Sequence, residues 1–402
     1  MFNDIQERPH HPKASATFKT PEQTAAAEEK TKPAIETIAL ENVPKKIKKN
    51  RKLSKKQIII GAIALAVIIL GVGGWFIYRH YHHPSVTKPS SAKVIKAKPV
   101  STIVPSTLSG LPVAPSFNKL PVTGIMVENE IDARPQSGLD QAGVVFEALA
   151  EGGITRFLAL YQDTQPSYIG PIRSARPYYV SWCMGFDCDY AHVGGSPDAL
   201  ADISSWGVND LNQFYNGSAY ERITSRVAPH NVYSSIASLN TLEDSKGYTT
   251  SNFQGFPRKA AAPLKVPTAT TLNLDIGTSE YNVTYTYNAT NNNYVRSEAG
   301  QLMTNIDSNG TLVQITPKVV IAIIVPFSQG ALDASDAYYS NYAVTGSGAA
   351  YVFQDGGVTV GTWQKTSNSA QITFTNDQSQ TIKLDPGQTW ITALTDSTQL
   401  TY

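Results

Sequence analysis

A run of 21 residues without a charged side chain, from Ile58 to Tyr78, restricts this chain more than any other feature. As an α-helix rising about 1.5 Å per residue it would be roughly 32 Å long, which matches the ~30 Å hydrocarbon core of a bilayer. Eight of the twelve residues 45–56 are basic, whereas residues 79–90 contain only Arg79 and Lys88. Because positively charged flanks stay in the cytoplasm, we predict a transmembrane helix over residues 57–78 with a cytoplasmic N-terminus.

The alternatives to this anchor are a cleavable signal peptide and a buried core helix. A signal peptide has a short charged start and an apolar run of about 7–15 residues, but here 57 residues precede a run of 21. Trp75 and Tyr78 also stand where the outer aromatic belt of a bilayer would lie. These features favour an uncleaved single-pass anchor in the cell membrane, with the rest of the chain extracytoplasmic.

The charges divide unevenly on the two sides of the apolar run. Residues 1–56 carry 13 basic and 7 acidic side chains, and residues 79–402 carry 20 and 25. The acidic excess beyond the anchor argues against nucleic-acid binding, which needs surplus Lys and Arg. We predict that residues 1–56 form a disordered cytoplasmic tail ending in a basic juxtamembrane run, and that residues 79–108, rich in Pro, Ser and Lys, form an extended stalk.

Residues 109–258 mix strand and helix signals, which predicts an α/β or α+β domain with a mixed sheet. Apolar runs at 144–146 and 156–161 flank a Gly-Gly turn and indicate a hairpin. Ser196 and Pro197 are typical of the N-cap and first residue of a helix, which Gly207 can end. A second helix is expected from Ser234 or Ser235 to Gly247.

Residues 265–402 carry almost only strand signals and predict a β-rich second domain. Apolar and polar side chains alternate from Tyr281 to Asn288, as in a strand with one buried face. The run Val319–Val325 is entirely apolar and lies between two prolines, so we expect a strand that is covered on both faces.

The first extracytoplasmic domain holds the candidate binding residues. Residues 121–255 contain six arginines and one lysine, a bias that favours planar, bidentate recognition of carboxylate or phosphate. The alternative is that these arginines pair internally with the 15 acidic residues of the same stretch. The predicted ligand-binding set is Arg156, Arg173, Arg176, His192, Ser196, Arg226, His230 and Asn231.

Candidates for acid–base catalysis are Glu147, Glu151, His192 and His230. Neighbouring arginines would oppose the raised pKa that a catalytic carboxyl needs, so an orienting or ion-pairing role is the alternative for both glutamates. The two histidines lack metal-ligand spacing, and carboxylates would have to complete a site; we therefore predict no metal and no cofactor. Ser196 is better explained as a helix cap than as a nucleophile.

Two cysteines, Cys183 and Cys188, are the only ones in the chain. Outside the membrane, thiols five residues apart can form a disulfide that closes a small loop. Free, buried thiols are the alternative. No cysteine lies near the outer end of the apolar run, so lipid attachment there is excluded.

Three ordered blocks carry a family resemblance: residues 133–139 (ARPQSGL), residues 146–157 (FEALAEGGITRF) and residues 169–177 (IGPIRSARP), followed by Pro229-His230-Asn231. They closely resemble the YerB-like putative lipoprotein family of bacteria. Later segments, among them Gly361-Thr362-Trp363 and residues 386–391 (PGQTWI), resemble that family's C-terminal domain. The resemblance spans roughly residues 108–400 and implies a bacterial cell-envelope location and a two-domain build. It implies no reaction.

Two features depart from the family pattern: an apolar helix and long tail replace the lipid-modified cysteine, and the cysteine pair is additional. The leading hypothesis is a membrane-anchored envelope protein that binds an anionic ligand, either a wall glycopolymer or a peptide carboxylate, in an Arg/His-lined cleft. The alternatives are an envelope hydrolase or transferase using Glu/His chemistry, and a structural module for protein interaction.

Overall fold

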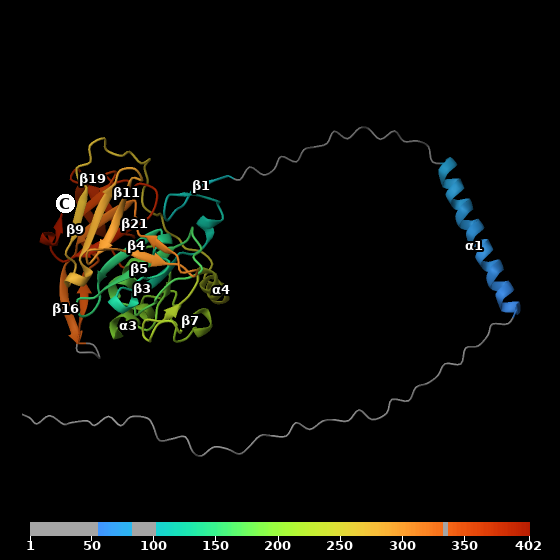
Figure 1. Ribbon diagram of the computed structural model, residues 1–402, viewed down its shortest axis with the longest axis horizontal. Helices are drawn as coiled ribbons and strands as arrows, with labels where there is room; N and C mark the ends of the chain where they lie inside the picture. The colour runs from blue at the N-terminus through green and yellow to red at the C-terminus, as the bar shows by residue number, and fades with distance from the viewer. Residues whose placement is uncertain (1–54, 83–101, 333–336) are drawn as a thin grey trace, which may run out of the picture. The chain divides into compact units, whose positions relative to one another are not determined.

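The computed structural model describes residues 55–82, 102–332 and 337–402. The chain divides into two compact units, residues 1–95 and 96–402 (Figure 1). In the first unit the described residues form one helix, α1 (Lys55–His82). Most of the predicted tail and stalk lies outside the described residues. The same holds for the side chains of residues 57–65 in α1.

Among the described residues, no helix combines the length and hydropathy of a membrane span. The helical conformation of α1 covers the predicted segment, and its insertion in a membrane stays a prediction.

The second unit contains three α-helices among its described residues: α2 (Pro177–Met184), α3 (Pro197–Ser205) and α4 (Ile236–Lys246). The strands of its first half are β1 (Val104–Pro105), β2 (Pro112–Val113), β3 (Thr123–Glu128), β4 (Val144–Leu149), β5 (Thr155–Tyr161), β6 (Asp189–Ala191), β7 (Glu221–Arg222) and β8 (Val232–Tyr233). The strands of its second half are β9 (Thr271–Leu274), β10 (Val283–Asn288), β11 (Asn293–Glu298), β12 (Gln301–Leu302), β13 (Thr304–Ile306), β14 (Leu312–Gln314), β15 (Val319–Ile324), β16 (Phe327–Leu332), β17 (Tyr338–Tyr342), β18 (Gly346–Gln354), β19 (Gly357–Lys365), β20 (Thr373–Asn376), β21 (Thr389–Leu394) and β22 (Leu400–Thr401).

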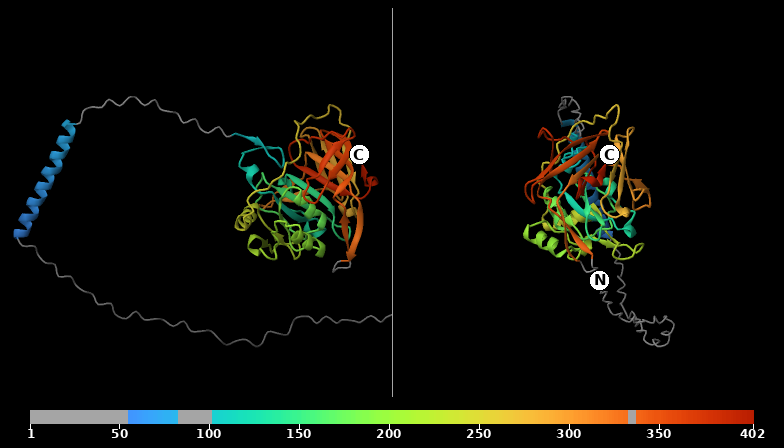
Figure 2. Two further views of the ribbon diagram at one scale, coloured as in Figure 1. Left: turned by 180° about the vertical axis from the view of Figure 1, so that it is seen from behind. Right: turned by 90° about the vertical axis from the view of Figure 1, so that its left-hand side faces the viewer.

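One mixed sheet of nine strands runs through both halves of this unit. Its order is β20-β19-β18-β15-β21-β4-β5-β3-β6, so β21 from the C-terminal end lies between β15 and β4 and pairs parallel with each. Figures 1 and 2 show the green strands of the first half beside the orange and red strands of the second. The predicted mixed sheet of the first domain is therefore present, but it continues into the β-rich half. The boundary between the two domains stays a prediction.

Successive side chains of the central strands point to opposite faces of the sheet, so the apolar core has one part on each face. Phe146, Leu158 and Ile321 belong to the core on one face, together with Trp182 of α2 and Ile203 of α3. On the other face, residues such as Val145, Phe157 and Trp390 pack with apolar residues of a five-stranded sheet, β12-β11-β10-β9-β22. Both faces of β15 are buried, which confirms the prediction for that strand.

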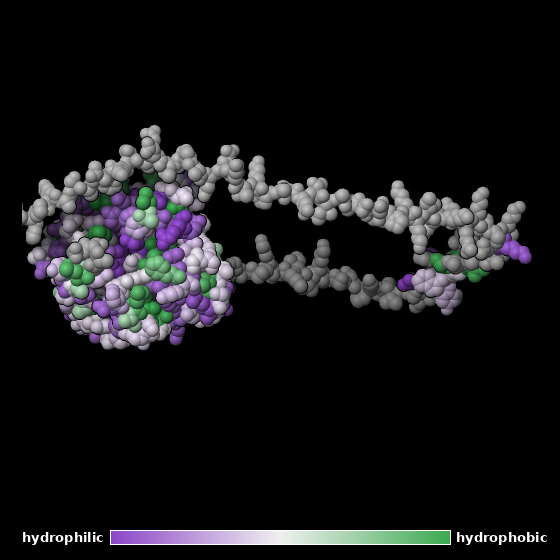
Figure 3. All heavy atoms as spheres, turned by 90° about the horizontal axis from the view of Figure 1, so that it is seen from below, coloured by the Kyte–Doolittle hydropathy of each residue, from purple (hydrophilic) through white to green (hydrophobic). Residues whose placement is uncertain are grey.

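The two predicted helices of the first half are confirmed, with their ends. The Ser196 hydroxyl accepts a hydrogen bond from the Ala199 amide and caps α3, and Gly207 beyond it has a φ of +70°. Ser235 caps α4, and Gly247 ends it in the left-handed region. The hairpin of β4 and β5 is also as predicted. Outside the core, apolar residues are scattered among polar ones on the face that Figure 3 shows.

A buried ion pair joins the central sheet to the five-stranded sheet. Glu147 in β4 and Arg296 in β11 are both inaccessible to solvent and form two hydrogen bonds of 2.7 and 3.0 Å. The Glu147 carboxylate also accepts hydrogen bonds from Trp390 and Thr392 of β21, and the Arg296 guanidinium lies 4.5 Å from the centre of the Trp390 ring. Burial alone would lower the pKa of Arg296, but the charge of Glu147 raises it overall. The arginine therefore remains charged.

Replacing one partner of this pair should destabilise the whole unit. Arg296→Met leaves the Glu147 carboxylate buried without its cation, and we expect the free energy of unfolding in urea to fall by about 3–5 kcal/mol. The double variant Glu147→Leu/Arg296→Met removes both charges and should recover part of that loss. Arg222→Met, on exposed β7, should stay within about 0.5 kcal/mol of the native chain. A single variant as stable as the native chain would contradict this role.

Candidate functional site

Four of the eight predicted binding residues gather around two acidic side chains at one end of the central strands. Glu128 ends β3 and is the direct register partner of Arg156 in β5, so the two side chains lie on the same face of the sheet. Both are buried. Glu151 follows β4 by two residues, and Arg173 and Arg176 lie in the segment that leads into α2.

Glu151 bridges two arginines. One of its carboxylate oxygens accepts a hydrogen bond from Arg156 and the other accepts one from Arg176. The main-chain carbonyls of Ser174 and Ala175 accept further hydrogen bonds from these guanidinium groups, at 3.1 and 2.6 Å. The Nε atoms of both arginines are buried and have no partner among the described residues. Two guanidinium groups therefore share one carboxylate.

The two buried cations affect each other electrostatically. Burial lowers the pKa of Arg176, and the adjacent charge of Arg156 lowers it further, so that Glu151 restores it only in part. The site consequently favours additional negative charge next to Arg176.

Arg176 also forms part of the wall of a pocket of ≈ 510 Å³, which we call the Arg176 pocket. The first residues of α2 and α3 line the pocket on one side, and β16 and β17 line it on the other. The ring of Tyr339 in β17 lies 4.8 Å from the Arg176 guanidinium. The main lining residues are Arg176, Pro177, Ser196, Pro197, Asp198, Leu332, Tyr339 and Asn341.

Glu128 binds a second pair of predicted residues. Its carboxylate lies 2.8 Å from Arg173 Nε and 3.0 Å from His230 Nδ1. Glu128 also attracts Arg156 across the strand pair. Arg156, Arg173, Arg176 and His230 thus belong to one network, which the structure holds together through Glu128 and Glu151.

The structure does not bring the other predicted residues into this network. His192 is fully buried, with Nδ1 2.7 Å from the Gly194 carbonyl and Nε2 3.0 Å from Asp210. Each ring nitrogen therefore has a hydrogen-bond partner inside the fold. Although burial raises the pKa of Asp210, hydrogen bonds from His192 and its charge lower it overall.

Arg226 and Asn231 are occupied by local contacts. Arg226 donates to the main-chain carbonyls of Asp132 and Pro135, at 3.0 and 2.7 Å. The side-chain oxygen of Asn231 accepts a hydrogen bond from Arg222. Of the predicted ligand-binding set, only Arg176 and Ser196 line the Arg176 pocket.

The candidate catalytic residues need correction. Glu147 lies on the opposite face of the sheet and is sealed against Arg296, which is incompatible with proton transfer to a dissolved substrate. Both oxygens of Glu151 are taken by arginines, and both ring nitrogens of His192 are bonded. Of the two candidate histidines, only His230 has a ring nitrogen, Nε2, without a hydrogen bond to the described part of the chain; this atom lies 4.0 Å from Glu130.

Glu128 and Tyr339 belong to the site but were not among the residues predicted from the sequence. Glu128 directly follows the apolar run Ile125-Met126-Val127, and a carboxylate at the end of such a run is a signal that could have pointed to it. Tyr339 lies more than 160 residues beyond Arg176 in the sequence. Nothing in the spacing of the residues indicates that contact.

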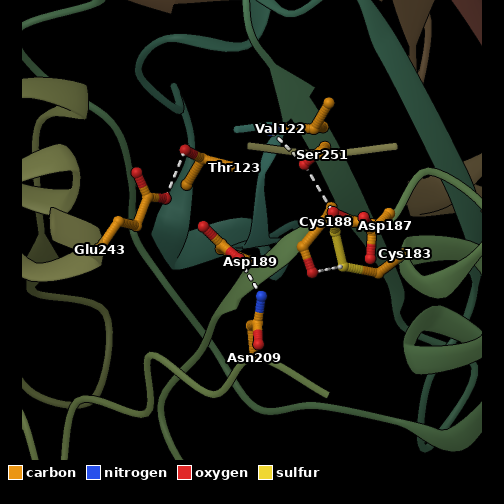
Figure 4. Close-up of a disulfide and its surroundings, with 9 residues drawn as sticks. All are labelled: Val122, Thr123, Cys183, Asp187, Cys188, Asp189, Asn209, Glu243 and Ser251. Atoms are coloured by element: carbon orange, nitrogen blue, oxygen red, sulfur yellow. Dashed lines mark hydrogen bonds between the residues drawn. A yellow bond between two sulfur atoms is a disulfide. The ribbon is translucent and has the colours of Figure 1, made fainter. Parts of the chain in front are cut away.

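Cys183 and Cys188 are joined as a disulfide with a Cα–Cα distance of 5.3 Å. Figure 4 shows that two further buried carboxyl groups lie in its surroundings. Glu243 of α4 accepts a hydrogen bond of 2.7 Å from Thr123, and Asp189 of β6 accepts one of 2.7 Å from Asn209. Burial raises the pKa of Glu243 to about 8 and that of Asp189 to about 6.

The chain is similar to known proteins over most of its length. Residues 108–249 match the "Protein of unknown function (DUF3048) N-terminal domain", and residues 272–391 match the corresponding C-terminal domain. "Putative lipoprotein YerB" of Bacillus subtilis (strain 168) is 30% identical over 314 residues, which cover 77% of this chain and 88% of that protein. The chain belongs to the YerB-like family.

The YerB-like fold is also represented by a crystal structure, that of the YerB protein from Bacillus subtilis. It superposes with a TM-score of 0.65 at 28% identity, over 74% of this chain and 99% of that one. The predicted family is thereby confirmed. Membership in the YerB-like family accounts for the shared architecture and carries no established reaction.

Glu243 should make the stability of this family member depend on pH. Burial raises the pKa of Glu243 from its ordinary value of 4.5 to about 8, so the folded state keeps this carboxyl protonated up to about pH 8. The folded state therefore binds the extra proton between these values, and stability falls as the pH rises through that window. At pH 8 we expect Glu243→Gln to unfold at a higher temperature than the native chain, because its free energy of unfolding should be larger by about 1–3 kcal/mol. Near pH 4.5 the two chains should be equally stable.

Differential scanning calorimetry between pH 4.5 and 8.5 measures this difference. Asp377→Asn, which removes an exposed carboxylate beyond β20, is the matched control and should leave the pH profile unchanged. Parallel profiles for Glu243→Gln and the native chain would show that Glu243 does not titrate in the expected window.

Proposed function

We propose that the chain is a membrane-tethered protein of the bacterial cell envelope that binds an anionic ligand in the Arg176 pocket. The observation that carries this proposal is the sharing of Glu151 by Arg156 and Arg176, whose buried Nε atoms have no partner among the described residues. A buried donor without an acceptor costs about 1–3 kcal/mol. Of the two arginines only Arg176 lines the pocket, and a ligand anion there would add negative charge next to its guanidinium.

The charge balance of the network supports an anionic ligand. Its arginines are Arg156, Arg173 and Arg176, and its carboxylates are Glu128 and Glu151, which leaves one positive charge in excess. Excess charge in a buried network is unfavourable unless an opposite charge compensates it. An anion in the Arg176 pocket would bind next to that excess.

The N-termini of α2 and α3 add to the positive potential of the Arg176 pocket. Pro177 and Pro197, the first residues of α2 and α3, both line it. Because helix N-termini carry partial positive charge, both favour an anion between them. Asp198 lines the same opening, so the pocket best fits a ligand that carries an amine close to its carboxylate. This pattern favours a peptide carboxylate of the cell wall over a polymer of repeated phosphates.

The membrane tether rests on the sequence and on the family. The Bacillus subtilis relative carries the name "Putative lipoprotein YerB", which supports an envelope location for this chain. The present chain has no cysteine before Cys183, but it has the 21-residue uncharged run with a basic flank. A single-pass helix would therefore replace lipid attachment as the anchor, with the N-terminus in the cytoplasm.

A structural module is the second candidate. Its support is that Arg156, Arg173 and Arg176 each form an ion pair with a carboxylate inside the chain, while Arg226 is held by main-chain carbonyls. If these bonds serve only to fix the loops, no ligand is needed. The acid–base enzyme has no comparable support, because Glu147, Glu151 and His192 are all fully engaged.

The binding proposal predicts that Arg176→Gln weakens binding of wall peptides. The full-length chain in detergent is titrated with soluble muropeptides carrying free carboxylates, and binding is followed by isothermal titration calorimetry. Loss of a charge-assisted contact should reduce affinity by about 10- to 100-fold. Arg222→Gln, which removes an exposed arginine, should bind as the native chain does.

Two ligand controls sharpen this experiment. Muropeptides with methyl-esterified carboxylates should not bind, and purified teichoic acid should bind more weakly than the free peptides. Thermal unfolding of Arg176→Gln separates a lost contact from a lost fold. If a stably folded Arg176→Gln chain binds like the native one, or if neither probe binds the native chain, the structural module is favoured.

The tether predicts a change of location when the apolar run is removed. Deletion of residues 58–78 should move the protein from the sedimented membrane fraction to the soluble fraction, because the ~30 Å span is lost. Replacing the run with 21 alternating Leu and Ala residues should retain the protein in the membrane. Protease added outside intact spheroplasts should degrade residues 96–402 and spare the tail; digestion of the tail first would reverse the proposed orientation.

A further inference from the structure

A histidine and two carboxylates converge next to Glu128, a member of the charge network. The ligand atoms of Glu130, Asp132 and His230 all lie within 4.8 Å of one another. Tetrahedral ligands about 2.1 Å from a zinc ion are about 3.4 Å apart. Small rotations of these partly exposed side chains would therefore suffice to place them around one ion.

The imidazole of His230 is oriented for metal binding. Its Nδ1 lies 3.0 Å from the buried Glu128 carboxylate, and its Nε2 faces Glu130 at 4.0 Å. In metal sites, a ligating histidine commonly donates its other ring N–H to a carboxylate, which fixes the ring and its tautomer. Glu128 stands in that position here, held in turn by Arg173.

The two acidic residues carry charge that no cation neutralises directly. Among the described residues, neither Glu130 nor Asp132 forms an ion pair with an arginine or a lysine. Arg173 bonds Glu128, and Arg226 bonds the main-chain carbonyls of Asp132 and Pro135. The latter contacts hold residues 130–135 against the loop that carries His230. The position of Glu130 and Asp132 beside His230 and their negative charge therefore both favour binding of a cation between them.

We propose that Glu130, Asp132 and His230 form a binding site for a divalent transition-metal ion, with Zn²⁺ as the ion that suits the donor set best. One imidazole nitrogen and two carboxylate oxygens are ligands that zinc accepts, and three protein ligands leave a position open for water or a ligand group. Calcium suits the set less well, because it prefers six to eight oxygen ligands. Spacing along the sequence did not indicate the site, because the fold supplies its carboxylates from a separate segment.

The test is a titration of the full-length chain, purified in detergent without a histidine tag, with ZnCl₂. Zn²⁺ that binds only the folded state raises the unfolding temperature, and we expect a rise of several degrees in the native chain and none in His230→Ala. The histidines at positions 10, 11, 80, 82 and 83 are present in both chains. The difference between the two chains therefore reports His230.

Conservative variants separate ligands from neighbours. Glu130→Gln and Asp132→Asn should each weaken Zn²⁺ binding at least tenfold. Glu128→Gln, which changes the positioning residue and no ligand, should weaken it by about 10- to 100-fold. Asp377→Asn, beyond β20 at the opposite edge of the nine-stranded sheet, should bind as the native chain does. Should His230→Ala fail to fold, the partly exposed Glu130 and exposed Asp132 variants carry the test.

Cobalt gives an independent readout of the imidazole ligand. Co²⁺ in the site should produce visible absorption bands that disappear in His230→Ala. The proposal is overturned if Zn²⁺ leaves the native unfolding temperature unchanged at millimolar concentration, or if His230→Ala binds with native affinity. It is also overturned if Ca²⁺ stabilises the native chain and His230→Ala equally, because the carboxylates would then act without the imidazole.

Discussion

The buried pair of Glu147 and Arg296 is the constraint on which the rest of this fold depends. Two charges taken out of water cost several kcal/mol each, and only close pairing with satisfied hydrogen bonds offsets that cost. Here the carboxylate bonds Arg296, Trp390 and Thr392. The pair therefore forms only when β4, β11 and β21 are all in place. A shift of register in any of these strands would leave a buried charge without its partners.

That requirement explains why the two halves of the sequence share one sheet. β21 can reach the pair only by lying next to β4, where Trp390 and Thr392 stand opposite Val145 and Glu147 in the register. On the opposite face of the same sheet, Arg156 of β5 and Glu128 of β3 are fixed as direct neighbours. The arrangement that buries one ion pair thus also fixes the position of the charge network on the other face.

Patterns within one element were enough to predict much of the local structure. Ser196 and Gly207 mark the ends of α3, Ser235 and Gly247 mark those of α4, and the uniform run of β15 indicates burial on both faces. Partners across the chain were beyond such patterns. Glu147 lies 149 residues from Arg296, and periodicity shows which face of a strand is buried without showing what buries it.

The same limit applies to the candidate site. The excess of arginine over lysine predicted a cluster of guanidinium groups, and Arg156, Arg173 and Arg176 do belong to one network. Of the residues predicted to line one cleft, only Arg176 and Ser196 line the Arg176 pocket, because residue type does not show which carboxylate each arginine meets. One side of the Arg176 pocket is formed by β16 and β17. No feature of the arginine-rich segments predicts that these strands pack there.

Glu128 connects the two proposed sites physically. It bonds His230 and Arg173 and attracts Arg156, which shares Glu151 with Arg176. A cation on His230 Nε2 would strengthen the donation from Nδ1 to Glu128, and so weaken the pull of Glu128 on Arg156. The positive excess at the Arg176 pocket would then grow, and an anion there would bind more favourably. By thermodynamic reciprocity the anion would strengthen cation binding by the same factor, so each ligand would favour the other through one shared carboxylate.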